Sequence, residues 1–246
     1  MAFPATFPVR QDMVESSDNW TFDPSTYIGN GPYKMTEWSH NAYISMEKNE
    51  NYYDYENLGP DTIKFTLLDD NNAMLKGYNN GELDFIENLP VDEIPTYLAS
   101  GELEIGDYLG TYYVCFNTED EVFSDPNIRK AFSLVIDRNY IVENVSQAGE
   151  VPADGYVPNG VNAAGAGSDD FRTVGGSYYS ISDEDYEANC EEARQLLADA
   201  GYPNGEGFPT VEYLYNTADN HKKIGEALQN MWQTELGVTV NLNNQD

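Results

Sequence analysis

The chain has 246 residues, and 12 Lys and Arg against 43 Asp and Glu give a formal net charge of −31. This length suggests one large domain or two smaller ones, and a composition of 40% hydrophobic and 13% aromatic residues is typical of a folded protein. Twelve scattered cations cannot neutralise a row of phosphates, so the composition argues against nucleic-acid binding and against an anionic membrane surface.

Targeting and redox features are sparse. No stretch approaches the ~18 apolar residues of a membrane-spanning helix. Residues 1–8 have neither a basic region nor a long apolar core, so we expect no signal peptide in this chain. Cys115 and Cys190 lie far apart without metal-type spacing. Two free, buried thiols are expected, with a single disulfide left open.

The first hundred residues predict short elements. Alternating apolar and polar residues, the period of half-buried strands, indicate strands over 33–38, 42–47, 63–67 and 83–86. Ser39-His40-Asn41 is typical of a hairpin connection between the first two strands. Short helices are expected over 73–78 and 91–99.

The remaining residues predict longer elements. The aromatic run 108–117 favours a strand, and Asp125 with Pro126 favours the start of an amphipathic helix. Residues 150–181 have no periodicity and indicate a long loop, followed by a helix from Ser182 that ends at Gly201. Strand, helix and strand over 211–215, 219–236 and 238–242 then predict a parallel pair. The fold class is therefore α/β with a mixed sheet. The last apolar strand stops four residues before the end of the chain, which suggests a fragment.

The sequence contains no recognisable motif for catalysis, nucleotide binding or metal binding. It contains no phosphate-binding glycine loop, no nucleophile elbow and no zinc or calcium motif. His40 and His221 are isolated, and no pair of carboxylates stands out as an acid and a base. We therefore expect no catalytic residue, no metal ligand and no cofactor. The tyrosines Tyr108, Tyr112 and Tyr113 leave two interpretations open, a strand-rich core or a platform that faces a ligand.

An ordered series of motifs resembles the extracellular solute-binding proteins of peptide-type ABC importers, the oligopeptide- and dipeptide-binding proteins. The resemblance lies in the segments 30–38, 47–53, 81–84, 112–118, 123–138, 193–202, 214–217 and 237–242. It implies a periplasmic-binding-protein-like α/β fold with mixed sheets in two lobes, incomplete at both ends. Residues 1–109 would belong to the first lobe and 110–246 to the start of the second, with a hinge near Gly110.

The function implied by the resemblance is capture of a short peptide between two lobes and its delivery to ABC permease subunits in the membrane. No catalysis is implied. Such a protein would be a monomer that works outside the cell, at the cell surface or in the periplasm, and the family includes lipoproteins. Its leader would be lost with the missing N-terminal part.

Ligand-binding residues are carried over from the family by position. Tyrosines that match Tyr108 and Tyr113 line the cleft of relatives, and an acidic residue stands where this chain has Cys115. Strand parity places Asn117 on the same face as Tyr113 and Cys115, whereas Tyr108 would point the opposite way unless Gly110 interrupts the strand. Glu87 and Asn88 also match ligand-contacting positions. The aspartate that grips a peptide amino terminus would fall beyond Asp246.

Two alternative functions stay open. Relatives of the same shape bind other small solutes, such as oligosaccharides or nickel complexes. An acidic extracellular carbohydrate-active enzyme is the alternative from a different class, because the chain is rich in carboxylates, tyrosine and asparagine.

Overall fold

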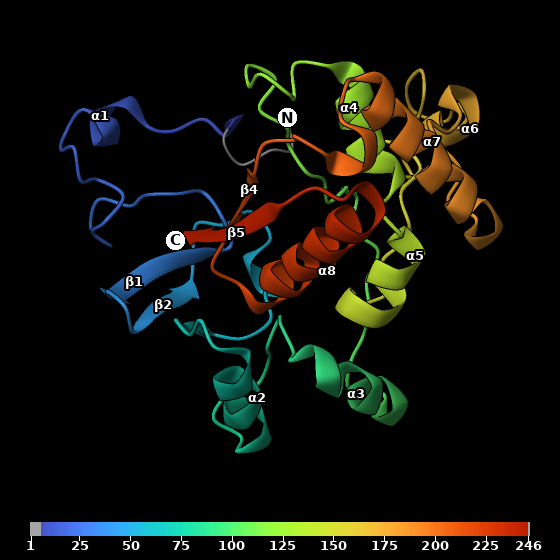
Figure 1. The fold of residues 1–246 in the computed structure, drawn as a ribbon. Helices are drawn as coiled ribbons and strands as arrows, with labels where there is room; N and C mark the ends of the chain where they lie inside the picture. The colour runs from blue at the N-terminus through green and yellow to red at the C-terminus, as the bar shows by residue number, and fades with distance from the viewer. Residues whose placement is uncertain (1–5, 246) are drawn as a thin grey trace. The chain divides into compact units, whose positions relative to one another are not determined.

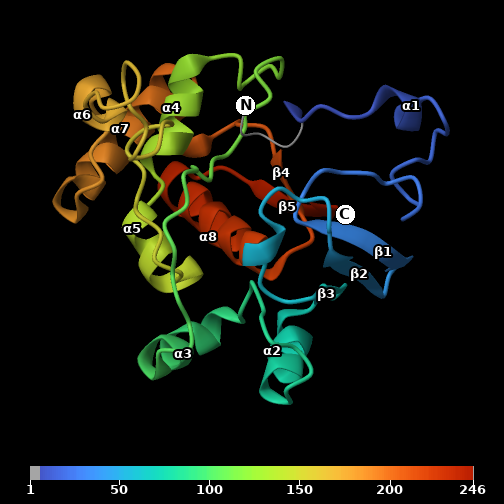
Figure 2. The ribbon, with the colours of Figure 1, turned by 180° about the vertical axis from the view of Figure 1, so that it is seen from behind.

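The computed structural model describes residues 6–245 (Figures 1 and 2). Residues 1–5, most of the segment considered for a signal peptide, and Asp246 lie outside the described residues. The chain divides into two compact units, Met1–Leu89 and Pro90–Asp246, and each is described by itself. The assignment of lobes on either side of residue 110 remains a prediction.

The first unit contains a three-stranded antiparallel sheet in the order β1-β2-β3. Its elements are α1 (Gln11–Val14), β1 (Tyr33–Ser39), β2 (Tyr43–Lys48), η2 (Tyr55–Asn57), β3 (Thr62–Thr66) and α2 (Asn71–Asn79). The predicted hairpin is confirmed, because β1 pairs with β2 from Ser39↔Tyr43 onward. Alternation places Trp38, Ile44 and Phe65 in register across the three strands, on one apolar face of the sheet.

The strand predicted over 83–86 is wrong. Gly81 adopts a left-handed φ of 74° at the end of α2, and the N–H groups of Glu82 and Leu83 both donate to the carbonyl of Gly77. Leu83 then packs on α2 so closely that a Cβ at Gly77 would lie 2.9 Å from its Cδ1. The apolar run therefore closes a helix instead of pairing in a sheet.

The second unit is built from helices around a two-stranded sheet. Its elements are η3 (Val91–Glu93), α3 (Ile94–Ser100), α4 (Pro126–Leu134), α5 (Arg138–Tyr140), η4 (Ile141–Ser146), α6 (Phe171–Gly175), η5 (Asp183–Asp185), α7 (Tyr186–Asp199), η6 (Pro203–Gly205), β4 (Val211–Asn216), α8 (Asp219–Leu236) and β5 (Val240–Gln245). Asp125 caps α4 as predicted, since its Oδ1 accepts from the N–H of Asn127.

The predicted parallel pair is confirmed by the register of β4 on β5, from Val211↔Val240 to Asn216↔Gln245. Helix α8 connects the two strands and packs against one face of the pair (Figure 1). Gly225 permits this close approach, because a Cβ there would lie 3.2 Å from Cε1 of Tyr213.

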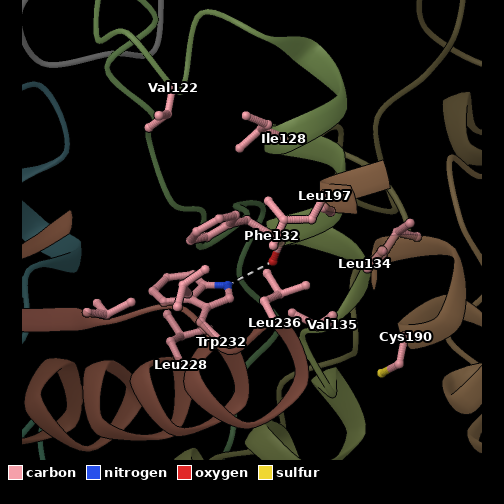
Figure 3. Close-up of a cluster of buried hydrophobic side chains, with 14 residues drawn as sticks. Val122, Ile128, Phe132, Leu134, Val135, Cys190, Leu197, Leu228, Trp232 and Leu236 are labelled. Carbon is pink, nitrogen blue, oxygen red and sulfur yellow. Dashed lines mark hydrogen bonds between the residues drawn. The ribbon is translucent and has the colours of Figure 1, made fainter. Parts of the chain in front are cut away.

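The core of the second unit lies between α4, α7 and α8. Figure 3 shows its buried side chains, among which Phe132, Leu197, Cys190 and Leu236 are at most 1% exposed. The indole Nε1–H of Trp232 donates to the main-chain oxygen of Phe132 across 2.8 Å. None of the described helices is long and apolar enough to cross a bilayer.

Three further expectations need correction. Residues 108–117 form no paired strand. The long loop 150–181 contains the short helix α6 and a bridge between Asn162 and Asp170. Both cysteines are free, as preferred, but only Cys190 is buried, and Cys115 is exposed.

Candidate functional site

The segment 111–117 of the second unit is extended and has two different faces. Exposure alternates over 113–117, because Tyr113, Cys115 and Asn117 are exposed whereas Val114 and Phe116 are partly buried, and Tyr112 departs from the alternation because it too is exposed. Strand parity therefore holds as predicted. Among the described residues, no main-chain hydrogen bond joins 111–116 to another segment, which is why these residues are extended without being a strand.

Two inner side chains and the exposed Tyr112 anchor the segment. Val114 and Phe116 pack against the core, where the ring of Phe116 lies 5.0 Å from that of Phe123. Tyr112 lies beside the sheet, with its ring 5.5 Å from that of His221 at the start of α8. Burial, together with a hydrogen bond to Tyr112, raises the pKa of Tyr213 on β4. These anchors fix which side chains project outward.

The side chain of His221 has a structural partner. Its Nδ1 lies 2.5 Å from Oδ1 of Asn216, the last residue of β4. The bond ties the start of α8 to the end of the strand, and the ring supports Tyr112. His221 therefore helps to hold Tyr112 and the junction of β4 and α8 in place.

The outer face begins with a pair of tyrosines. The ring of Tyr113 meets that of Tyr156 edge to face, with 5.0 Å between centroids and 69° between planes. Both side chains remain more than half exposed, at 55% and 62%. A hydrogen bond with the Tyr156 hydroxyl raises the pKa of Tyr113, and the charges of Tyr156 and Cys115 add to the effect. Tyr156 lies in a loop without periodicity, so no local sequence pattern predicts its place beside Tyr113.

Cys115 and Asn117 continue the outer face. Oδ1 of Asn117 accepts from the backbone N–H of Glu119 across 3.2 Å, which orients its amide and leaves the NH₂ group to face solvent. Together with Tyr113, these two exposed residues form a neutral, aromatic and weakly polar surface without a carboxylate of its own. Such a surface can stack on apolar groups and can donate and accept hydrogen bonds.

Tyr108 lies apart from this alternation. The N–H of Gly110 donates to the carbonyl of Tyr108 across 3.0 Å, which forms a tight three-residue turn. The ring of Tyr108 folds over Gly110, where a Cβ would lie 2.7 Å from its Cε1, and the side chain is 92% exposed. Gly110 thus interrupts the extended segment, with a turn in place of the bulge considered from the sequence.

Glu87 and Asn88 are exposed and belong to the first unit, at its carboxyl end. Their grouping with Tyr113, Cys115 and Asn117 remains a prediction. Hollows also occur elsewhere in the second unit. A cavity of about 20 Å³ adjoins Arg138 and Asn139, and an open hollow of about 660 Å³ lies along 177–182. Neither is lined by a predicted ligand residue, and within residues 6–245 no three His, Cys, Asp or Glu gather as metal ligands do.

Comparisons with known proteins agree on one family. The model of "Bacterial extracellular solute-binding proteins, family 5 Middle" matches residues 1–246. The oligopeptide-binding protein OppA of Bacillus subtilis is 33% identical over an alignment of 250 positions, which covers 100% of this chain and 44% of that protein. The chain therefore spans less than half the length of this curated relative.

Solved structures give the same relationship. The murein tripeptide-binding protein MppA of Escherichia coli superposes with a TM-score of 0.83 at 33% identity, over 98% of this chain and 45% of that one. OppA of Haemophilus influenzae in complex with RPPGFSPFR gives 0.80 at 28% identity, over 97% and 45%. The α/β fold is thus that of periplasmic peptide-binding proteins, and the chain belongs to family 5 of the bacterial extracellular solute-binding proteins.

Proposed function

We propose that this chain forms part of the substrate-binding component of an ABC importer, which captures short peptides between two lobes and delivers them to permease subunits in the membrane. Family membership supports this proposal, as do similar proteins that are known as peptide-binding proteins. Capture of this kind requires no catalysis and no cofactor. The proposed working place is outside the cell, at the cell surface or in the periplasm, as a monomer.

The observation that carries the proposal is the outer face of 111–117. Tyr113, Cys115 and Asn117 project from a segment whose inner side chains are fixed in the core, so that their positions are set before a ligand arrives. Glu87, Asn88 and Tyr108 complete the proposed set of contacts from residues 87–108. The tight turn at 108–110 is the proposed hinge between lobes 1–109 and 110–246.

Cys115 bears on the kind of peptide that binds. The resemblance implies a carboxylate at this position in relatives, and the thiol of this chain would then lack one charge-assisted contact with a ligand. The remaining outer face is neutral. We therefore expect binding through stacking and through hydrogen bonds to the peptide main chain, with little dependence on an ion pair at Cys115.

Titration calorimetry tests the proposal. Trialanine and a pool of tri- to pentapeptides are titrated into the protein, with free amino acids and malto-oligosaccharides as controls. Saturable binding of peptides, without binding of the controls, is the expected result. Binding of sugars alone would favour the oligosaccharide alternative, and hydrolysis of sugars in the same samples would favour the enzyme.

A further inference from the structure

We propose, on the basis of the function proposed above, that Tyr156 forms a second wall of the peptide-binding surface and that Arg172 positions this wall through Gly155. Tyr156 is 62% exposed and contributes little to the core, yet its ring meets that of Tyr113 at a defined angle. Two exposed rings at 69° form a corner, which can hold an apolar or aromatic peptide side chain on two sides.

The backbone next to Tyr156 rests on a buried guanidinium. The side chain of Arg172 is only 10% exposed, and a Cβ at Gly155 would overlap its Nη1. Gly155 does not have a positive φ, so its backbone conformation would accept alanine and only the contact with Arg172 requires glycine. Arg172 therefore sets the position of the backbone at residue 155. This position in turn sets the direction in which the side chain of Tyr156 projects.

Arg172 itself has little freedom to move. Its guanidinium lies over the ring of Phe171 at 5.3 Å, and a Cβ at Gly175 would lie 3.2 Å from its Nη2. Nη1 lies 3.7 Å from Oδ1 of Asp154, the residue before Gly155. An alanine at residue 155 must therefore displace either a confined charge or the loop that bears Tyr156.

The loop is held from its other side as well. The main-chain oxygen of Asp154 accepts from the N–H of Tyr178 across 3.0 Å, and its carboxylate accepts from the hydroxyl of Ser177. The hydroxyl of Tyr179 donates to the oxygen of Ala153 across 3.2 Å. Residues 153–155 are thus fixed by several contacts, whereas the Tyr156 side chain remains free to meet a ligand.

The hydrogen bonding of Arg172 also points to a role beyond stability. Nε and Nη1 are buried, and neither makes a hydrogen bond within the described residues. A buried charge with unmade hydrogen bonds is unfavourable, and an apolar side chain of similar size would fill this space at less cost in stability. The charge is explained by its attraction to Asp154, which holds the loop at one place.

A double-mutant cycle tests the proposal in the intact protein. Affinity for a tripeptide with a central phenylalanine is measured by calorimetry for wild type, Tyr156→Ala, Gly155→Ala and the double variant. Each single variant is expected to bind about tenfold more weakly, in the range of interface hot spots. The double variant should bind no more weakly than Tyr156→Ala alone, because Gly155 acts through that ring. Gly59→Ala, where a Cβ has open space, is the matched control and should bind as wild type does.

The outcomes separate the two proposals. Unchanged affinity in folded Tyr156→Ala, with binding weakened by Tyr113→Ala, would overturn the second wall. Additive losses in the double variant would overturn positioning by Arg172 and Gly155. Failure of wild type to bind any peptide would overturn the proposed function. The positioning of Tyr156 by Arg172 and Gly155 would then be tested by a measurement that needs no ligand.

The ligand-free measurement is the titration of the Tyr113 phenol, followed by NMR on 13C-labelled tyrosine and assigned with Tyr113→Phe. Tyr156→Phe should lower the Tyr113 pKa toward its ordinary value, because that hydroxyl raises it. Gly155→Ala and Arg172→Lys should lower it too, and Gly59→Ala should not. A pKa that falls in Tyr156→Phe but stays unchanged in both Gly155→Ala and Arg172→Lys would overturn the positioning role, and thermal melts identify any variant that fails to fold.

Discussion

The indole of Trp232 on α8 and the main-chain oxygen of Phe132 on α4 are joined by a hydrogen bond of 2.8 Å inside the core. Phe132 lies in the last turn of α4, where carbonyl groups have no partner within the helix. The bond satisfies one of them, and the two rings also pack with 5.5 Å between centroids. One side chain thus joins α8 to the helix that follows the candidate site.

Replacing this indole should destabilise the second unit. Trp232→Phe leaves the buried carbonyl of Phe132 unpaired and opens a small cavity, so we expect a loss of about 2–4 kcal/mol in the free energy of unfolding. Urea denaturation measures the change. Trp20→Phe, at a partly exposed position in the first unit, is the matched control and should lose less than about 1 kcal/mol. Equal losses in both variants would contradict the account of the core.

Stability should fall in alkali because of Cys190. Burial raises the pKa of its thiol to about 11, above the ordinary value of 9.0. Between these values the unfolded chain releases the proton and the folded one keeps it, so the stabilisation is complete below pH 9 and is lost as the pH rises toward 11. Urea titrations at pH 8 to 11 should show this fall, and Cys190→Ala should make it shallower between pH 9 and 10, below the ordinary pKa of tyrosines such as Tyr186 and Tyr213, whose pKa burial also raises. Cys115→Ala, at an exposed thiol, should retain the slope of wild type. An equal slope in Cys190→Ala would assign the fall to other groups.

Loss of the Tyr113 ring should weaken binding without unfolding the protein. The side chain is 55% exposed, so Tyr113→Ala removes a stacked contact from the ligand and little from the core. We expect the affinity for a short peptide to fall by about 1–3 kcal/mol. Calorimetry with Tyr140→Ala as control, a tyrosine of similar exposure in α5, makes the comparison. Unchanged affinity in folded Tyr113→Ala would return this ring to a structural role.

Charge should also bias the choice of peptide. Residues 77–128 contain all six proposed ligand residues and twelve Asp and Glu, without a single Lys or Arg. Every Lys and Arg of residues 90–246 already contacts a carboxylate or a main-chain oxygen. A tripeptide with a central lysine should therefore bind about threefold to tenfold more tightly than its glutamate analogue at low salt. The ratio of the two affinities should shrink at about 0.5 M salt, because exposed charges are then screened. A preference for glutamate would contradict this view of the site.

Local patterns in the sequence predicted most elements of the fold. The hairpin of β1 and β2, the cap of Asp125 and the parallel pair of β4 and β5 all follow from periodicity and end signals that lie within each element. The two wrong strands share one cause. An alternating sequence predicts alternating exposure, which residues 113–117 show. A strand also needs a partner with unpaired main-chain groups, and no local pattern encodes that partner.

The candidate site could be predicted from the sequence only in part. Parity correctly placed Tyr113, Cys115 and Asn117 on one exposed face. Tyr156 could not be found, because its approach to Tyr113 depends on a loop held by Arg172 rather than on any repeat in the sequence. Glu87 and Asn88 belong to the first unit, and a local sequence pattern does not predict how the two units are arranged, so it cannot test whether these residues group with the others.

The most direct test of the central claim is a thermal melt with and without a pool of short peptides. A peptide present at 100 times its Kd stabilises the folded state by about 2.7 kcal/mol, which corresponds to roughly 5–10 °C for a chain of this size. If the chain captures peptides, the melt should be cooperative and should shift upward with peptide but not with sugars. A cooperative melt that peptide leaves unmoved would contradict peptide capture by this chain.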